Sequence, residues 1–230
     1  MEIQDNIDKV RQIISASALN AGRDANAVTL AAVTKFQSAE RINEAIHCGV
    51  KVIAENRAQE LAEKYPYIDK KNGVQIHFIG HLQKNKIKYI IDKVDMVQSV
   101  DSLELASALD TAASKIGKRL DILLQVNIGN EPQKSGFEIS RVIDAAVKMS
   151  EYSSLRLCGL MAILPVDVDK EGAGKLFSEM CKLFLDIRAK IEDNDSISVL
   201  SMGMSNDYAW AIENGSTFVR VGRAIFGERK

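Results

Sequence analysis

The sequence predicts an α/β protein folded as a (β/α)8 TIM barrel with an additional N-terminal helix. Short apolar runs alternate with longer amphipathic segments from residue 29 onward, which is typical of repeated βα units around a parallel sheet. Eight such runs can be counted, and eight parallel strands can close into a barrel without exposed edges. No linker rich in proline, glycine or serine interrupts the series, so we expect residues 1–230 to form a single domain. A doubly wound open sheet is the alternative, because counting strands does not exclude it.

The expected elements follow the chain in order, beginning with an amphipathic helix at 3–20. The predicted strands are apolar runs that end in polar residues or glycine, at 29–33, 51–54, 75–79, 96–99, 121–126, 157–161, 197–201 and 217–221. The segments between them carry apolar residues at helical spacing, so each strand should be followed by a helix. The lysine-rich run at 84–93 is interpreted as the solvated face of one such helix.

Composition and charge limit the classes of function. The chain carries 30 Lys and Arg against 31 Asp and Glu, so no global field favours nucleic acid or an anionic membrane. No apolar run reaches the ~18 residues of a membrane span, and three cysteines form no disulfide framework or metal spacing. We therefore expect a cytoplasmic monomer with no nucleic-acid, membrane or metal partner.

Lys35 comes two residues after the first predicted strand, where a TIM barrel carries its chemistry. Lost hydration at the barrel mouth should lower the pKa of this lysine from about 10.4, which makes a nucleophilic amine available for a Schiff base. The alternative is that Lys35 only marks where the strand reaches water, with its charge extended outward.

Two late turns suggest a phosphate site. Gly203 and Ser205 follow the seventh predicted strand and Gly222 follows the eighth, which is the usual phosphate position of TIM barrels. We expect Ser205 or Asn206 to cap the next helix, whose first N–H groups would favour an anion. Read singly, the two glycines are ordinary turn residues.

Three further polar residues interrupt apolar runs. Arg220 lies inside the last predicted strand, where a buried guanidinium needs a structural carboxylate or an anionic ligand as a partner. His77 and His81 are four residues apart, but the segment reads as strand, so a helical metal pair is not expected. We expect His77 to be a hydrogen-bonded histidine and His81 to line a pocket.

Six ordered blocks carry a resemblance to a known family. They are AVTK (32–35), ENRAQE (55–60), IHFIGHLQKNK (76–86), QVNIGNEPQKSGF (125–137), GLMAI (159–163) and LSMGMSNDYAWAIENGSTFVRVGRAIFGER (200–229). With these blocks the chain resembles the YggS/PROSC family of pyridoxal 5′-phosphate (PLP) binding proteins, which is related in fold to the N-terminal barrel of alanine racemase. The likeness extends over nearly the whole chain.

The resemblance implies that Lys35 holds PLP as an internal aldimine. It places Arg220 beside the cofactor, in contact with either the phosphate or the ring nitrogen. The other implied cofactor-binding residues are Ser201, Gly203, Ser205, Gly222 and Arg223 around the phosphate, and Asn56, His77, Met161 and Met202 around the ring. Two positions depart from the family pattern: Ala54 stands where a glycine is expected, and Arg223 where a small hydroxyl residue is common.

The resemblance further implies a binding protein that acts in PLP (vitamin B6) homeostasis and supplies cofactor to client enzymes, and not an enzyme. The alternative is a PLP-dependent amino-acid racemase or lyase, because PLP provides an electron sink. A racemase like alanine racemase takes its second acid/base from an added β domain, and we expect no such domain in a chain that ends at Lys230. An arginine at the pyridine nitrogen would also weaken the electron sink.

Overall fold

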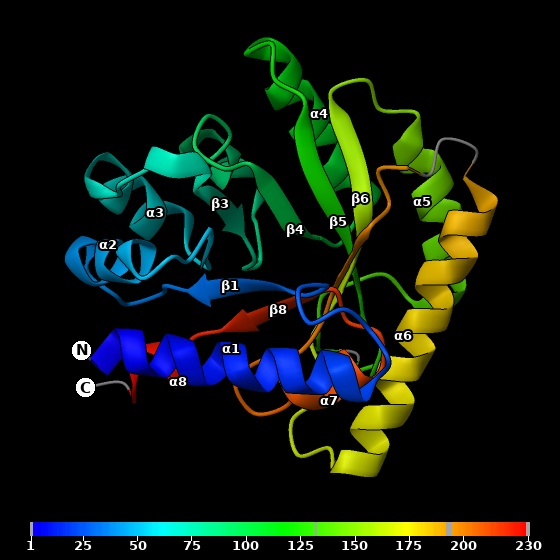
Figure 1. The fold of residues 1–230 in the computed structure, drawn as a ribbon. Helices are drawn as coiled ribbons and strands as arrows, with labels where there is room; N and C mark the ends of the chain where they lie inside the picture. The colour runs from blue at the N-terminus through cyan, green and yellow to red at the C-terminus, as the bar shows by residue number, and fades with distance from the viewer. Residues whose placement is uncertain (1, 132, 192–194, 229–230) are drawn as a thin grey trace.

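The computed structural model describes residues 2–131, 133–191 and 195–228, and its centre is a closed barrel of eight parallel strands (Figure 1). The strands are β1 (Thr29–Val33), β2 (Val52–Glu55), β3 (Gln75–Phe78), β4 (Met96–Val100), β5 (Leu120–Val126), β6 (Leu155–Ala162), β7 (Val199–Ser201) and β8 (Phe218–Val221). Each strand pairs with its neighbour in sequence, and β1 pairs with β8, where Ala31 lies opposite Arg220. The predicted barrel is therefore confirmed, and the open sheet is excluded.

Helices surround the barrel and include the additional one at the N-terminus (Figure 1). They are α1 (Glu2–Asn20), α2 (Ala39–His47), α3 (Ala58–Lys64), α4 (Leu103–Lys115), α5 (Val142–Ser150), α6 (Lys170–Lys190), α7 (Tyr208–Glu213) and α8 (Arg223–Phe226). The apolar side chains of α1 recur at helical spacing, and Ile3, Ile7, Val10 and Ile14 are all buried. In Figure 1, α1 runs beside α7 and α8, so the first helix packs near the last ones. None of the described helices combines the length and the hydropathy that crossing a membrane requires.

The connection between β3 and β4 differs from the expected α-helix. The lysine-rich run forms a 3-10 helix, η3 (Lys84–Tyr89), followed by turns. Three isoleucines in and after it, Ile87, Ile90 and Ile91, are buried, and β-branched side chains lose rotamer freedom in an α-helix. Shorter 3-10 helices are η1 (Tyr65–Tyr67), η2 (Lys71–Gly73) and η4 (Ile139–Arg141).

The core has an apolar outer layer and a partly polar interior. One large cluster of buried apolar residues joins the strands to the helices, and two small clusters, around Ala54 and around Met161, lie apart from it. Six polar side chains on the strands are also buried: Glu55, His77, Gln98, Ser99, Ser201 and Arg220. Buried polar groups destabilise a fold unless they are hydrogen-bonded, so the interior of this barrel must supply them with partners.

Close contact between β6 and β7 requires glycine at position 159. Gly159 has a φ of +144°, and a Cβ atom placed there would lie 1.9 Å from the main-chain oxygen of Val199. The register between β5 and β6 also shifts just before this point, between Ile122 and Leu123. A side chain at residue 159 would therefore separate two strands of the barrel.

Candidate functional site

A cavity of about 870 Å³ opens at the carboxyl ends of the strands. Lys35, half-buried two residues after β1, lines it together with Ser205, Arg220, Gly222 and Arg223. These residues come from opposite ends of the sequence and meet because β1 pairs with β8. The structure therefore brings the expected amine and most of the residues expected to bind the phosphate into one cavity.

Hydrogen-bond donors converge on Ser205 at one side of this cavity. The Ser205 hydroxyl oxygen accepts from the main-chain N–H groups of Gly222 at 3.3 Å and Ala224 at 3.4 Å. The Arg223 guanidinium lies close by and donates to the Asn206 side chain at 2.8 Å. A hydroxyl, two N–H groups and a guanidinium in one place are suited to the oxygens of a phosphate.

The helix cap expected at Ser205 or Asn206 is wrong. The helix α7 begins at Tyr208, so the cap position is Asp207, whose side chain makes no capping bond. Its carboxylate accepts from the Met204 N–H at 2.6 Å instead and closes the turn after β7. Ser205 is thereby left to contact the start of α8.

Arg220 is almost fully buried at the inner side of the cavity. Its Nη1 donates to the Ser201 hydroxyl at 2.6 Å and its Nη2 to the main-chain oxygen of Ala162 at 2.8 Å. Burial lowers the pKa of Arg220 to about 10, and the Asp207 charge acts in the opposite direction. The hydrogen-bond partners of this guanidinium among the described residues are thus neutral groups, which leaves its positive charge available to an anion or a ring nitrogen.

A chain of buried side chains continues from Arg220 across the barrel. The Ser201 hydroxyl donates to Gln98 Oε1 at 2.7 Å, and Gln98 Nε2 lies 2.9 Å from His77 Nδ1. The His77 ring stacks on Phe218 with 5.4 Å between ring centroids. Burial lowers the pKa of His77 to about 4. His77 is a hydrogen-bonded histidine as expected, but it does not line the cavity that Lys35 lines.

The remaining expected residues lie around this arrangement. Met161 and Met202 are fully buried and do not line the cavity. Gly203 has a φ of +95°, and its main-chain oxygen accepts from the Arg220 N–H at 3.0 Å. A Cβ atom at residue 203 would lie 2.9 Å from Tyr208 Cα. None of these three residues lines the cavity, and Gly203 is connected to it through its hydrogen bond with Arg220.

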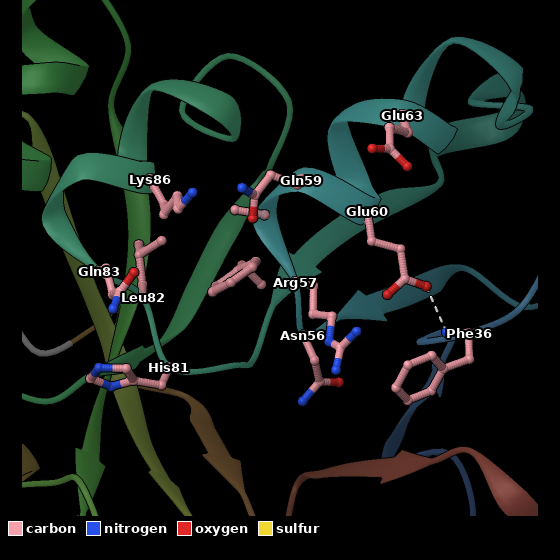
Figure 2. A pocket seen from close by; sticks show the side chains of 12 residues that line it. Phe36, Asn56, Arg57, Gln59, Glu60, Glu63, His81, Leu82, Gln83 and Lys86 are labelled. Atoms are coloured by element: carbon pink, nitrogen blue, oxygen red, sulfur yellow. Dashed lines mark hydrogen bonds between the residues drawn. The ribbon is translucent and has the colours of Figure 1, made fainter.

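Asn56 lines a second pocket, of about 580 Å³, next to the carboxyl ends of β2 and β3 (Figure 2). Arg57 lies in the same pocket with its guanidinium 4.7 Å from the centroid of the Phe36 ring. The Phe36 N–H donates to Glu60 at 2.6 Å, drawn as the dashed line in Figure 2. His81 also lines this pocket, as expected. The Asn56 Oδ1 atom is buried and has no hydrogen-bond partner among the described residues.

The sequence places Glu55 and Gln98 among the polar residues at strand ends, but neither was predicted as a cofactor-binding residue. Glu55 is fully buried, and its carboxylate accepts a hydrogen bond of 2.7 Å from the hydroxyl of Thr34. Thr34 is the residue directly before Lys35 in the sequence. Burial raises the pKa of Glu55. The partners of Glu55 and Gln98 are far away in the sequence. The spacing of apolar residues predicts strands and helices, but it does not identify such pairs.

The charges and donors of the first cavity fit a phosphorylated ligand with a reactive carbonyl. Its described lining contains four basic side chains, Lys35, Lys134, Arg220 and Arg223, against the carboxylates of Asp167, Asp207 and Glu228. Among residues 2–131, 133–191 and 195–228, no three histidine, cysteine or acidic side chains gather as metal ligands do. The fold and site define a TIM barrel with an amine and an anion-binding group at the carboxyl ends of its strands.

Comparison with known proteins identifies the family. The family model described as alanine racemase, N-terminal domain, matches residues 2–230. The pyridoxal phosphate homeostasis protein of Pasteurella multocida is 37% identical over 230 residues, which cover 100% of this chain and 98% of that protein. The chain belongs to the alanine racemase N-terminal domain family, among its pyridoxal phosphate homeostasis proteins, as its resemblance to the YggS/PROSC family predicted.

Solved structures agree with this assignment. A crystal structure of an unknown protein from Bifidobacterium adolescentis is 36% identical, with a TM-score of 0.94 over 98% of this chain and 94% of that chain. The structure of PipY from Synechococcus elongatus PCC7942 with PLP bound is 28% identical, with a TM-score of 0.85 over 98% of this chain and all of that one.

Proposed function

We propose that this protein binds PLP through Lys35 and acts in PLP homeostasis. The observation that carries the proposal is the meeting of Lys35 with Ser205, Gly222 and Arg223 in one cavity. The names of the homologues and the PLP bound to PipY support the same cofactor. The cavity volume also lies within the range of small-molecule sites.

Each end of the cavity has a distinct part in binding. When bound, PLP supplies an aldehyde that reacts with amines and a ring that can accept electrons. Lys35 would supply the amine that condenses with this aldehyde, with loss of water. Ser205, Gly222 and Arg223 hold the phosphate with a hydroxyl, a main-chain N–H and a guanidinium. The presence of Arg223 in place of a small hydroxyl residue makes this phosphate contact ionic.

The ring of the cofactor would then lie between the two ends. Asn56 lines the second pocket and not this cavity, and its buried Oδ1 atom, which has no hydrogen-bond partner among the described residues, is an acceptor that a ligand group could satisfy. Met161 and His77 contribute to the ring pocket by fixing the barrel interior, whereas Met202 packs in the apolar layer between the strands and the helices. Arg220 contacts either the phosphate or the ring nitrogen. It lines the cavity, and its described hydrogen bonds go to a hydroxyl and a carbonyl oxygen, neither of which neutralises its charge.

We favour cofactor binding and delivery to client enzymes over catalysis. The curated relatives are named homeostasis proteins, and an arginine at the ring nitrogen would keep that nitrogen unprotonated and weaken the electron sink. An amino-acid racemase or lyase is the second candidate, because the family description refers to alanine racemase.

Incubation of the PLP-loaded protein with single L-amino acids separates the two candidates. A binding protein should show the absorbance of its Schiff base without sustained formation of the D-enantiomer or of cleavage products. Steady turnover that requires Lys35, and that disappears in Lys35→Ala, would instead support the enzyme.

A further inference from the structure

The buried hydrogen bonds that begin at Arg220 have a fixed direction. A guanidinium only donates, so the Ser201 oxygen must accept from Arg220 Nη1. Because the Gln98 amide turns its Oε1 toward Ser201, the single Ser201 proton is directed to that oxygen. This fixes the Gln98 amide with Nε2 toward His77 Nδ1, which must accept. The bonds therefore require a neutral His77 that carries its proton on Nε2.

The surroundings of these side chains keep the arrangement intact. His77, Gln98, Ser201 and Arg220 are each at most 3% exposed, so no water competes for their hydrogen bonds. The stacked Phe218 ring holds the His77 ring in one orientation. Burial opposes protonation of His77, with a pKa lowered to about 4, which agrees with the acceptor role of Nδ1.

Two consequences concern ligand binding. Ser201 has no hydrogen left to donate to a phosphate, because its only proton is used by Gln98. Arg220 is held at two nitrogens, by Ser201 and by the Ala162 oxygen. Its other N–H groups are the ones available to a ligand in the cavity that it lines.

We propose that His77, Gln98 and Ser201 form a relay of hydrogen bonds that positions Arg220 for the cofactor, with Gln98 as the central positioning residue. This inference rests on the proposed binding of PLP and deepens it. Ser201 acts through Arg220 rather than on the phosphate itself. Gln98 connects β4 to β7 and to β3, so it couples the cofactor site to the opposite wall of the barrel.

Two substitutions test the relay. Gln98→Met keeps the length of the side chain but removes both hydrogen bonds, and Ser201→Ala removes the hydroxyl that Arg220 contacts. Each should raise the PLP dissociation constant about 10-fold or more, as expected for lost hydrogen bonds to a charged group, and should shift the absorbance maximum of the bound cofactor. Ser99→Ala is the matched control: it removes a buried hydroxyl on β4 that donates to the Gly80 oxygen. The PLP dissociation constant of this control should stay within 2-fold of the wild-type value. Circular dichroism confirms that each variant is folded.

A measurement on the protein without PLP tests the direction of the bonds. Nitrogen-15 NMR of labelled histidine should find the His77 proton on Nε2. A proton on Nδ1 would overturn the relay, and so would PLP affinities of Gln98→Met and Ser201→Ala within 2-fold of wild type with an unchanged spectrum. If the wild-type protein did not bind PLP, the proposed function would fail, and the tautomer would still decide the direction of the relay.

Discussion

Lys64 Nζ donates a hydrogen bond of 3.1 Å to the main-chain oxygen of Thr34, the residue before Lys35. The same ammonium group pairs with Glu60, and Glu60 accepts from the N–H of Phe36, the residue after Lys35. Phe36 has a φ of 64°, which is uncommon for a bulky side chain. Lys64 therefore holds the turn that presents Lys35 to the cavity.

Replacement of Lys64 should destabilise the protein strongly. Lys64→Ala leaves the Glu55 carboxylate, whose side chain has no exposed surface, without its cation at 3.3 Å. We expect the free energy of unfolding to fall by about 3 kcal/mol, as for a broken buried ion pair, in urea denaturation at pH 7. The matched control is Lys175→Ala, whose ion pair with Glu171 is largely exposed and should change stability by less than about 0.5 kcal/mol. Equal effects of the two substitutions would contradict the role of Lys64.

Glu55 should make the protein less stable as the pH rises. Burial raises the pKa of Glu55 above its usual value of 4.5, so between pH 4.5 and the folded pKa the folded protein keeps a proton that the unfolded chain has already released. The contribution of this group to stability is therefore lost as the pH rises from 4.5 through the folded pKa. Glu55→Gln carries no such proton, so its free energy of unfolding relative to wild type should increase between pH 4.5 and 7. Parallel pH profiles in chemical denaturation would refute this prediction.

His77 should have the opposite pH dependence. Its pKa is lowered from 6.5 to about 4 by burial, so acidification protonates the unfolded chain first. Stability due to neutral His77 is complete above pH 6.5 and is lost as the pH falls toward 4, by on the order of 3 kcal/mol. His77→Gln should lose less stability than wild type between pH 7 and pH 4.5. An NMR titration of His77 with a midpoint near 6.5 would show that burial does not depress its pKa.

The two glycines at residues 159 and 117 should respond differently to alanine. Both have a positive φ, but a Cβ atom at Gly159 meets the Val199 oxygen at 1.9 Å, whereas one at Gly117 has nothing within 4 Å. Gly117→Ala should lower the free energy of unfolding by about 1 kcal/mol, through backbone strain alone. Gly159→Ala should cost about 4 kcal/mol or prevent folding, because β6 and β7 must separate. Similar melting temperatures for the two variants would exclude this account of the contact between strands.

Much of the fold was predictable because each strand of a parallel barrel is a short apolar run. The strand at 29–33 was predicted with its observed bounds, whereas β7 begins at Val199 rather than at residue 197. The helix predicted for residues 84–93 was wrong, because the buried isoleucines of this segment favour a 3-10 helix and turns over an α-helix. That residues 1–230 form a single domain stays a prediction.

The candidate site was predictable only where the topology determines it. Lys35 and Gly222 meet because β1 pairs with β8 in any closed barrel of this order. The relay through Gln98 was not predictable, because Gln98 and Ser201 are separated by 103 residues and lie on strands that do not pair. Their contact depends on which side chains cross the barrel interior, and no sequence period encodes this.

Borohydride reduction of the PLP-loaded protein, followed by peptide mass mapping, tests the central claim most directly. Reduction converts the C=N bond into a stable C–N bond and marks the lysine that carries the cofactor. We predict a single phosphopyridoxyl group on the peptide that contains Lys35, and none in Lys35→Ala. A label on Lys134, which lines the same cavity, with Lys35 unmodified would contradict the account.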